Sequence, residues 1–231
     1  MELIEKIVLD AEKNVCNTNY FKDKGYGNKT ILRHRLGYLK DGLLPYADEI
    51  DEDRMILACY KYVIPNYDFE NKLTYLIIRR DEVSMKEQLP FEIDKTFILG
   101  NFKNNIWNAK DLNNEQCVFV CETWTDAISI IDCGYNAIAL NKINNIVDLW
   151  KCIKFYNLIH KKYILFCDND YYGKKTNNNL SKMMESQKCE YIVLNSFPER
   201  IKDANEWYIY DKNSFMKMLG DGISGICKNV K

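Results

Sequence analysis

A strict alternation of short apolar segments and helical patterns between residues 118 and 194 constrains the fold most. The apolar segments are typical of buried strands and lie at Val118–Cys121, Ala137–Leu140, Tyr163–Cys167 and Tyr191–Leu194. The segments between them have helical periodicity and lie at Asp126–Cys133, Ile146–His160 and Lys174–Gln187. Buried strands joined by helices form a mostly parallel sheet with right-handed crossovers. We therefore expect an α/β lobe with a four-stranded, mostly parallel sheet flanked by helices.

A smaller lobe of mixed α+β structure is expected before this sheet. The chain begins with a helical stripe of apolar residues, Leu3, Ile4, Ile7, Val8, Ala11 and Val15. Strands are then predicted at Met55–Ile64 and Lys72–Arg79, separated by a turn at Pro65–Asp68.

We place the boundary between the two lobes near Asn113-Asn114-Glu115. Residues 1–113 then form the first lobe, residues 114–211 the second, and residues 212–231 a C-terminal helix or tail.

Composition narrows the classes of protein that fit. The 231 residues are 47% hydrophobic, enough to bury a full core, and the formal net charge of −1 gives no global basic field. Contact with nucleic acid must then come from a local patch, and Lys22–Lys40 is basic, although a solvated helix face would look the same.

Because the sequence has neither a signal-peptide layout nor an apolar run of membrane-spanning length, we expect a cytoplasmic protein with no membrane contact. Nine cysteines without a Cys-x-x-Cys pair indicate reduced thiols rather than a zinc site.

Two carboxylates follow the strand that starts at Tyr163. Asp168 and Asp170 are two residues apart, which in extended chain places both side chains on the same side. Such a pair repels itself unless a cation lies nearby, and Mg²⁺ is a hard ion that accepts carboxylate ligands. The alternative is an acidic turn that only helps to start the next helix.

Two further acidic turns belong to the same lobe. Glu122 and Asp126 follow the first strand, and Asp203 lies in the segment Lys202–Glu206 after the last one. Parallel strands present their carboxyl ends at one edge of a sheet, so these acids can share a site with Asp168 and Asp170.

These motifs resemble a known domain. The sequences Glu-Thr-Trp-Thr-Asp at 122–126, Asp-Asn-Asp at 168–170 with Gly173, and Lys-Asp-Ala-Asn-Glu at 202–206 are similar to the three motifs of the TOPRIM domain of bacterial and phage DNA primases. Upstream, Tyr20–Tyr26 with Leu36-Gly37-Tyr38, and Val63–Arg79, are similar to the beginning of the primase polymerase core. The resemblance covers residues 20–210, and it departs from the pattern at Thr123, where glycine is usual, and at Lys24, where arginine is usual.

The resemblance implies a DNA primase-like nucleotidyltransferase of DNA replication, which makes short RNA primers on single-stranded DNA with Mg²⁺ or Mn²⁺. It implies that the catalytic residues are Glu122, Asp168 and Asp170, with Glu122 either a metal ligand or a general base. The implied metal ligands are Glu122, Asp126, Asp168, Asp170 and Asp203. The candidates for contacts to nucleotide or template are Lys24, Arg79, Arg80 and Lys202.

Two other functions remain open: a TOPRIM-type metal-dependent nuclease, and a non-catalytic replication or regulatory DNA-binding protein. For the primase, we expect single-stranded DNA and nucleoside triphosphates as ligands. We find no zinc-binding template-reading module before the core and no helicase domain after it, so we expect a replicative helicase or a separate template-reading module as a partner in trans. The small size and the Asn-, Lys- and Ile-rich composition would suit a phage or mobile-element protein.

Overall fold

The structure is a computed structural model that describes residues 2–101, 106–113 and 117–228, and it divides into two compact units. Unit 1 comprises Met1–Tyr67 and Lys72–Phe102, and unit 2 comprises Asp68–Asn71 and Lys103–Lys231. Residues 114 and 115, where the sequence suggests a boundary, lie outside the described residues. The domain limits after residues 113 and 211 therefore stay a prediction.

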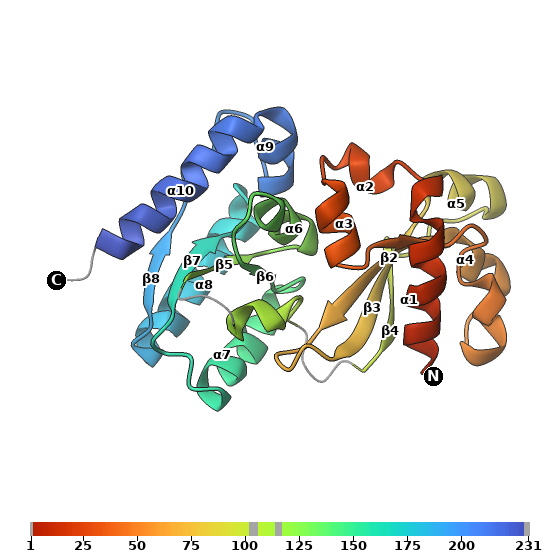
Figure 1. The fold of residues 1–231 in the computed structure, drawn as a ribbon, viewed down its shortest axis with the longest axis horizontal. Helices are drawn as coiled ribbons and strands as arrows, with labels where there is room; N and C mark the ends of the chain where they lie inside the picture. The colour runs from red at the N-terminus through yellow and green to blue at the C-terminus, as the bar shows by residue number, and fades with distance from the viewer. Residues whose placement is uncertain (1, 102–105, 114–116, 229–231) are drawn as a thin grey trace. The chain divides into compact units, whose positions relative to one another are not determined.

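Unit 1 contains an antiparallel sheet with the strand order β1-β2-β3-β4 (Figure 1). Its strands are β1 (Gly37–Tyr38), β2 (Tyr60–Tyr67), β3 (Leu73–Arg80) and β4 (Thr96–Gly100). The strand predicted at Lys72–Arg79 is confirmed as β3. Pro65, predicted to begin a turn, instead lies within β2 opposite Leu76.

Unit 1 also contains several helices, most of them short. They are α1 (Leu3–Asn14), η1 (Val15–Asn17), α2 (Tyr20–Asp23), α3 (Asn28–Arg33), η2 (Leu44–Glu49), α4 (Arg54–Cys59) and α5 (Glu82–Gln88). Four residues of the apolar stripe predicted near the N-terminus, Ile4, Ile7, Val8 and Ala11, form the buried face of α1. This face packs into one core with residues of the sheet such as Val63, Leu76 and Ile78. Val15, the last residue of the predicted stripe, lies in η1 and is half-buried. The helix lies so close to β1 that a Cβ on Gly37 would meet the Ala11 Cβ at 2.4 Å. Glycine at this position therefore lets the helix and the sheet pack.

The strand predicted at Met55–Ile64 is wrong in its first half, because residues 54–59 form the helix α4. The Asp53 carboxylate accepts hydrogen bonds from the backbone N–H groups of Met55, at 2.8 Å, and Ile56, at 3.3 Å. The acidic run before the segment therefore ends in a helix N-cap. A short apolar run does not distinguish a strand from a buried helix by periodicity.

Unit 2 contains a parallel sheet with the strand order β6-β5-β7-β8. Its strands are β5 (Cys117–Cys121), β6 (Ala137–Ala139), β7 (Lys162–Phe166) and β8 (Glu190–Val193). The four-stranded parallel sheet expected from the sequence is therefore confirmed. An antiparallel bridge between Trp107 and Ala139 adds one isolated pairing to β6.

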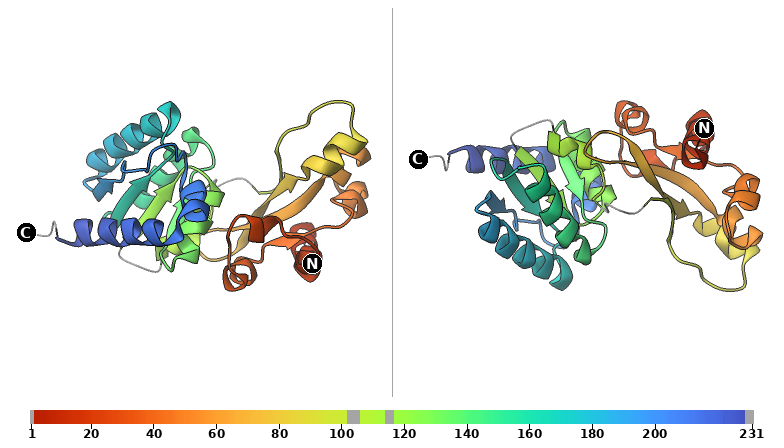
Figure 2. Two further views of the ribbon diagram at one scale, coloured as in Figure 1. Left: turned by 90° about the horizontal axis from the view of Figure 1, so that it is seen from above. Right: turned by 90° about the horizontal axis from the view of Figure 1, so that it is seen from below.

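Helices cover both faces of this sheet, with α7 and α8 on one face and α6, α9 and α10 on the other (Figure 2). The helices of unit 2 are η3 (Ala109–Asn113), α6 (Trp124–Asp132), η4 (Ile143–Asn145), α7 (Ile146–Phe155), α8 (Tyr171–Gln187), α9 (Ala204–Tyr210) and α10 (Lys212–Lys228). The first face has an aliphatic core that includes Val118, Leu165 and Leu180. The second has aromatic contacts such as Phe166 with Phe215. A sheet buried on both faces explains why its strands read as continuous apolar runs.

Two further findings concern the whole chain. None of the helices in the described residues is long and apolar enough to cross a membrane. All nine cysteines lie within the described residues and are free thiols, with Cys121 and Cys167 buried and Cys117 half-buried.

Candidate active site at the carboxyl edge of the parallel sheet

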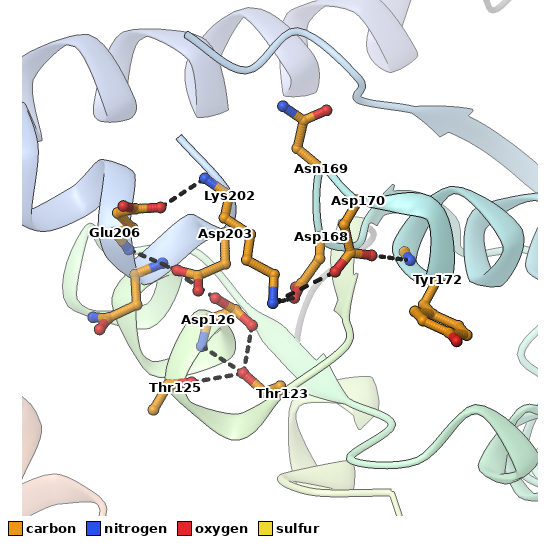
Figure 3. Close-up of polar contacts among 12 residues, drawn as sticks. Thr123, Thr125, Asp126, Asp168, Asn169, Asp170, Tyr172, Lys202, Asp203 and Glu206 are labelled. Carbon is orange, nitrogen blue, oxygen red and sulfur yellow. Dashed lines mark hydrogen bonds and ion pairs between the residues drawn. The ribbon is translucent and has the colours of Figure 1, made fainter. Parts of the chain in front are cut away.

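Three acidic loops lie at one edge of the unit 2 sheet (Figure 3). Cys121 is paired with Phe166 in parallel register, so the turn at Glu122 and the loop at Asp168 leave the sheet at the same level. The third loop is fastened to the second by Asn169, whose backbone N–H donates to the Lys202 carbonyl at 2.6 Å. The Asn169 side chain also donates to the carbonyl before Lys202, at 3.2 Å. The three acidic turns of the sequence therefore meet at one edge, as predicted.

Asp168 and Asp170 are close in sequence but lie in different environments. Asp170 is the N-cap of α8, and its carboxylate accepts hydrogen bonds from the backbone N–H groups of Gly173, at 2.8 Å, and Tyr172. The Gly173 hydrogen bond, with help from Lys202, lowers the pKa of Asp170. The side chain of Asp168 is only 12% exposed, and burial raises its pKa to about 8. One carboxyl group is thus driven toward the neutral form while its neighbour stays ionised.

The distance between these acids and α8 depends on Gly173. A Cβ at this position would lie 2.0 Å from the backbone oxygen of Asp168. No side chain fits at that distance, so glycine allows the first turn of α8 to pack directly on the Asp168 backbone.

Lys202 supplies positive charge between the two carboxylates. Its Nζ lies 3.4 Å from Oδ2 of Asp170 and 3.8 Å from Oδ2 of Asp168. The negative charge of Asp168 is the largest of the influences that raise the pKa of Lys202. The ammonium group therefore offsets part of the repulsion between the acids.

Glu122 follows β5 directly and is half-buried. Burial, followed by the negative charge of Asp170, raises its pKa. Its buried Oε2 has no hydrogen-bond partner among the described residues. A buried carboxylate oxygen without a partner is costly, and such atoms in native proteins often contact a ligand or an ion.

Thr123 occupies the position where the TOPRIM pattern usually has glycine. Its φ of −123° and ψ of 158° are extended backbone, which any residue adopts. Its hydroxyl oxygen also caps α6 by accepting a hydrogen bond from the Asp126 N–H at 3.5 Å. The departure from the pattern therefore introduces no backbone strain at this turn.

Asp126 joins α6 to the third acidic loop. Its Oδ1 accepts a hydrogen bond from the Asn205 N–H at 3.1 Å, and its Oδ2 accepts one from the Thr123 hydroxyl. Burial, followed by the negative charge of Asp203, raises its pKa to about 6. Asp203 itself is the N-cap of α9 and accepts a hydrogen bond from the Glu206 N–H at 2.7 Å. The oxygens of Asp126 are thus already engaged in holding the loops together.

The donor set at this edge consists of carboxylate oxygens, which suits Mg²⁺ or Mn²⁺. The oxygens best available to such an ion are Glu122 Oε2, which has no hydrogen-bond partner in the described part of the chain, and those of the Asp168–Asp170 pair, which already attracts an ammonium group. Within the described ranges, no three acidic, histidine or cysteine side chains are grouped closely enough to hold an ion in this arrangement.

Two of the predicted basic contacts, Lys24 and Arg79, lie in unit 1 around one aromatic side chain. The Lys24 Nζ lies 5.4 Å from the ring centroid of Tyr20, and the charge of Arg79 also acts on the Tyr20 hydroxyl. The Tyr20 ring stacks on Tyr62, with centroids 3.8 Å apart, and burial raises the pKa of Tyr20 to about 12. Lys24 therefore lies beside the Tyr20 ring, and Arg79 is close enough for its charge to act on the same residue.

Arg80 does not present its guanidinium group to solvent. It is 5% exposed, it forms two hydrogen bonds of 3.1 Å with the Glu82 carboxylate, and it donates a third to the Ile93 carbonyl. The sequence pair Arg79-Arg80 concealed this difference, because successive residues of a strand point to opposite faces. We therefore remove Arg80 from the residues available to bind phosphate.

Asn141, which is not among the residues predicted from the sequence, holds the Glu122 turn. Its backbone N–H donates to the Glu122 carbonyl at 2.7 Å, and its side-chain oxygen accepts from the Trp124 N–H at 3.0 Å. It adopts a left-handed conformation with φ of 58°, which asparagine tolerates better than most residues. The sequence signal that could have indicated this role is an asparagine directly after the predicted strand Ala137–Leu140.

A comparison with protein-family models matches residues 119–208 to a family described as Toprim-like. This segment contains three of the four sheet strands in full and all three acidic loops. The resemblance to the TOPRIM domain, stated above from the motifs alone, is confirmed. No curated protein sequence matches the chain.

Solved structures extend the likeness to both units. A structure of the Aquifex aeolicus primase with its zinc-binding and RNA polymerase domains has a TM-score of 0.70 at 17% identity, and the match covers 96% of this chain. This chain spans 59% of that primase chain. The E. coli primase catalytic core has a TM-score of 0.61 at 13% identity and covers 98% of this chain and 82% of its own. The primase fragment of the bacteriophage T7 primase-helicase protein has a TM-score of 0.59 at 16% identity and covers 87% and 72%. The chain therefore has the fold of primase catalytic cores.

Proposed function

We propose that this chain is a DNA primase-like nucleotidyltransferase that synthesises short RNA primers on single-stranded DNA. The observation that carries the proposal is the extent of the structural likeness, since primase cores match 87% to 98% of the chain and not only the Toprim-like segment. A Toprim-like domain alone would suit a nuclease equally well. The match over unit 1 is what favours the primase.

The reaction is a phosphoryl transfer. The 3′-hydroxyl of the growing primer attacks the α-phosphate of a nucleoside triphosphate, a new phosphodiester bond forms, and pyrophosphate leaves. Mg²⁺ or Mn²⁺ held by Glu122, Asp168 and Asp170 would stabilise charge on the phosphoryl group and lower the pKa of the attacking hydroxyl. Glu122 is also the candidate general base, because its raised pKa brings it closer to the pH at which a base works best.

The remaining residues of the site have supporting roles. Asp126 and Asp203 are second-tier ligands whose main task is to hold α6 and α9 in register with the acid pair. Lys202, next to Asp170, is placed to contact a phosphate. Lys24 and Arg79 of unit 1 are proposed to contact the phosphates of template or nucleotide.

Partners follow from the same proposal. The ligands are single-stranded DNA and nucleoside triphosphates. One matched structure belongs to a primase-helicase protein of bacteriophage T7, and we extend that association to a replicative helicase or a separate template-reading module that acts in trans.

The test is incubation of the chain with single-stranded DNA, labelled ribonucleotides and Mg²⁺ or Mn²⁺, with the products separated on a denaturing gel. We expect short RNA products from the wild type and from the matched control Asp221→Asn, an exposed acid of α10. The Asp168→Asn variant should lose them. Full activity of Asp168→Asn would contradict the site, and a shortened template that depends on Asp168 would replace the primase by the nuclease.

A further inference from the structure

Two exposed aromatic rings lie directly beside the acid pair. Tyr171 and Tyr172 are the first residues of α8 and follow Asp170 without a gap. They are 73% and 67% exposed. Their ring centroids are 5.4 Å apart and their planes meet at 80°. No hydrogen bond to either hydroxyl occurs among the described residues, so no polar contact explains why these side chains stand in solvent.

The backbone that carries the rings is fixed. The Asp170 carboxylate holds the N–H of Tyr172, and the Thr176 hydroxyl donates to the Tyr172 carbonyl at 2.9 Å. Gly173 packs the same turn against the backbone of Asp168. The backbone from which the rings project is therefore held by the same contacts that hold the acids.

Core packing does not account for the rings either. The buried face of α8 comprises Gly173, Thr176, Asn177, Leu180, Met183 and Met184, and both tyrosines lie outside it. Lys174 and Lys175 follow directly and are exposed, and neither forms an ion pair within the part of the chain that the structure describes. This turn therefore combines flat aromatic surface, positive charge and, next to them, two carboxylates. A nucleotide offers the matching groups, which are a base, phosphates and a bound divalent cation.

We infer that Tyr171 and Tyr172 form a stacking platform for a nucleobase at the acidic edge of the sheet, a role that rests on the proposed function. Two perpendicular rings offer a flat base one ring face, with the second ring at its side. Every base has such a face, so the platform holds bases without selecting their sequence. The base belongs either to the incoming nucleoside triphosphate or to the DNA template.

The experiment measures binding of matched ligands with and without a base. The nucleotide arm compares ATP with ribose 5-triphosphate, and the strand arm compares oligo(dT) with an abasic strand of equal length, all in Mg²⁺. The variants are Tyr171→Ala/Tyr172→Ala, the conservative Tyr171→Phe/Tyr172→Phe, and the control Phe155→Ala, which removes an 81% exposed ring from α7. The altered side chains are exposed, and thermal unfolding confirms that each variant folds.

Stacking contributes about 1–3 kcal/mol per base, so the double alanine variant should bind the base-containing ligand about 5- to 150-fold more weakly. It should bind the base-free ligand as the wild type does. The double phenylalanine variant and Phe155→Ala should keep wild-type affinity. If the double alanine variant binds only ATP more weakly, the base belongs to the nucleotide. If it binds only oligo(dT) more weakly, the base belongs to the template.

Equal affinity of the wild type and the double alanine variant for both base-containing ligands would overturn the platform. Primer synthesis that still depends on Asp168 would then leave the proposed function standing. A wild type that binds neither ATP nor oligo(dT) would contradict the platform and the proposed function together.

Discussion

The ionised form of Asp168 is disfavoured by its surroundings, and a nearby cation can reduce this cost. Burial, followed by the nearby negative charges of Asp126 and Glu122, raises its pKa to about 8. Lys202 offsets part of this effect from 3.8 Å. A group in this state makes the metal-free protein less stable when it ionises, because the folded form holds its proton more tightly than the unfolded form.

The Asp168→Asn variant should therefore be more stable than the wild type, and increasingly so as the pH rises. The folded pKa is above the ordinary value of 3.8, so the wild type loses stability between about pH 4 and pH 8. Asparagine has no proton to lose. We expect a gain of a few kcal/mol, up to about 5, at pH 8.5, and little gain at pH 4. Thermal unfolding in a chelator measures it, and a difference independent of pH would contradict the raised pKa.

At the scale of single residues, the sequence predicted the acids but not all of their surroundings. The spacing of Asp168 and Asp170 after a strand was enough to place them on one side of the chain. Arg80 was misassigned, because adjacent arginines on a strand look alike until the sheet shows which one is buried. Asn141 was missed because its hydrogen bonds reach a turn that lies 19 residues earlier in the chain.

Within the elements, the first turn of α8 depends on one glycine. Gly173→Ala should lower stability by about 1–3 kcal/mol, because a Cβ at 2.0 Å from the Asp168 oxygen forces the helix away from the acids. Metal-dependent activity should fall with it. The matched control is Gly225→Ala in α10, where a Cβ meets nothing within 4 Å. That substitution should be neutral or stabilise the helix by up to about 1 kcal/mol. Urea unfolding of both variants tests the contrast, and equal effects would contradict it.

The beginning of α6 depends on Thr123. Replacing its hydroxyl in Thr123→Ala should cost about 0.5–2 kcal/mol, because the helix loses its N-cap. The buried Asp126 carboxylate also loses a donor. Thr123→Ser keeps the hydroxyl and should retain most of the stability. Chemical denaturation of the pair separates the cap from simple loss of volume, and equally large losses would show that the hydroxyl is not responsible.

The helices and strands were predictable where apolar segments and helical periodicity alternate along the sequence. The strands and helices of unit 2 follow from apolar runs of the length that a buried parallel sheet requires. Residues 54–59 were not predictable in this way, since the apolar run from Met55 continues without interruption into β2. The decisive signal was the cap at Asp53, two residues earlier, which the acidic run around it concealed.

For the molecule as a whole, the sequence predicted a smaller mixed lobe followed by a TOPRIM lobe. The structure has an antiparallel sheet in unit 1 and a parallel sheet in unit 2. The proposed function uses residues of both units, because Lys24 and Arg79 belong to unit 1 and the candidate acids belong to unit 2. An activity that needs template, nucleotide and acids together is therefore the strictest test of the account.

The most direct measurement supplies ATP labelled in its γ-phosphate, a single-stranded template that contains thymidine, and Mg²⁺ or Mn²⁺. A primer begun from a free nucleotide keeps that phosphate at its 5′ end, whereas extension of an existing strand releases it. The account predicts labelled short oligonucleotides that need the template and disappear in Asp168→Asn and Asp170→Asn. Label that never enters an oligonucleotide while the template is cleaved would contradict the account.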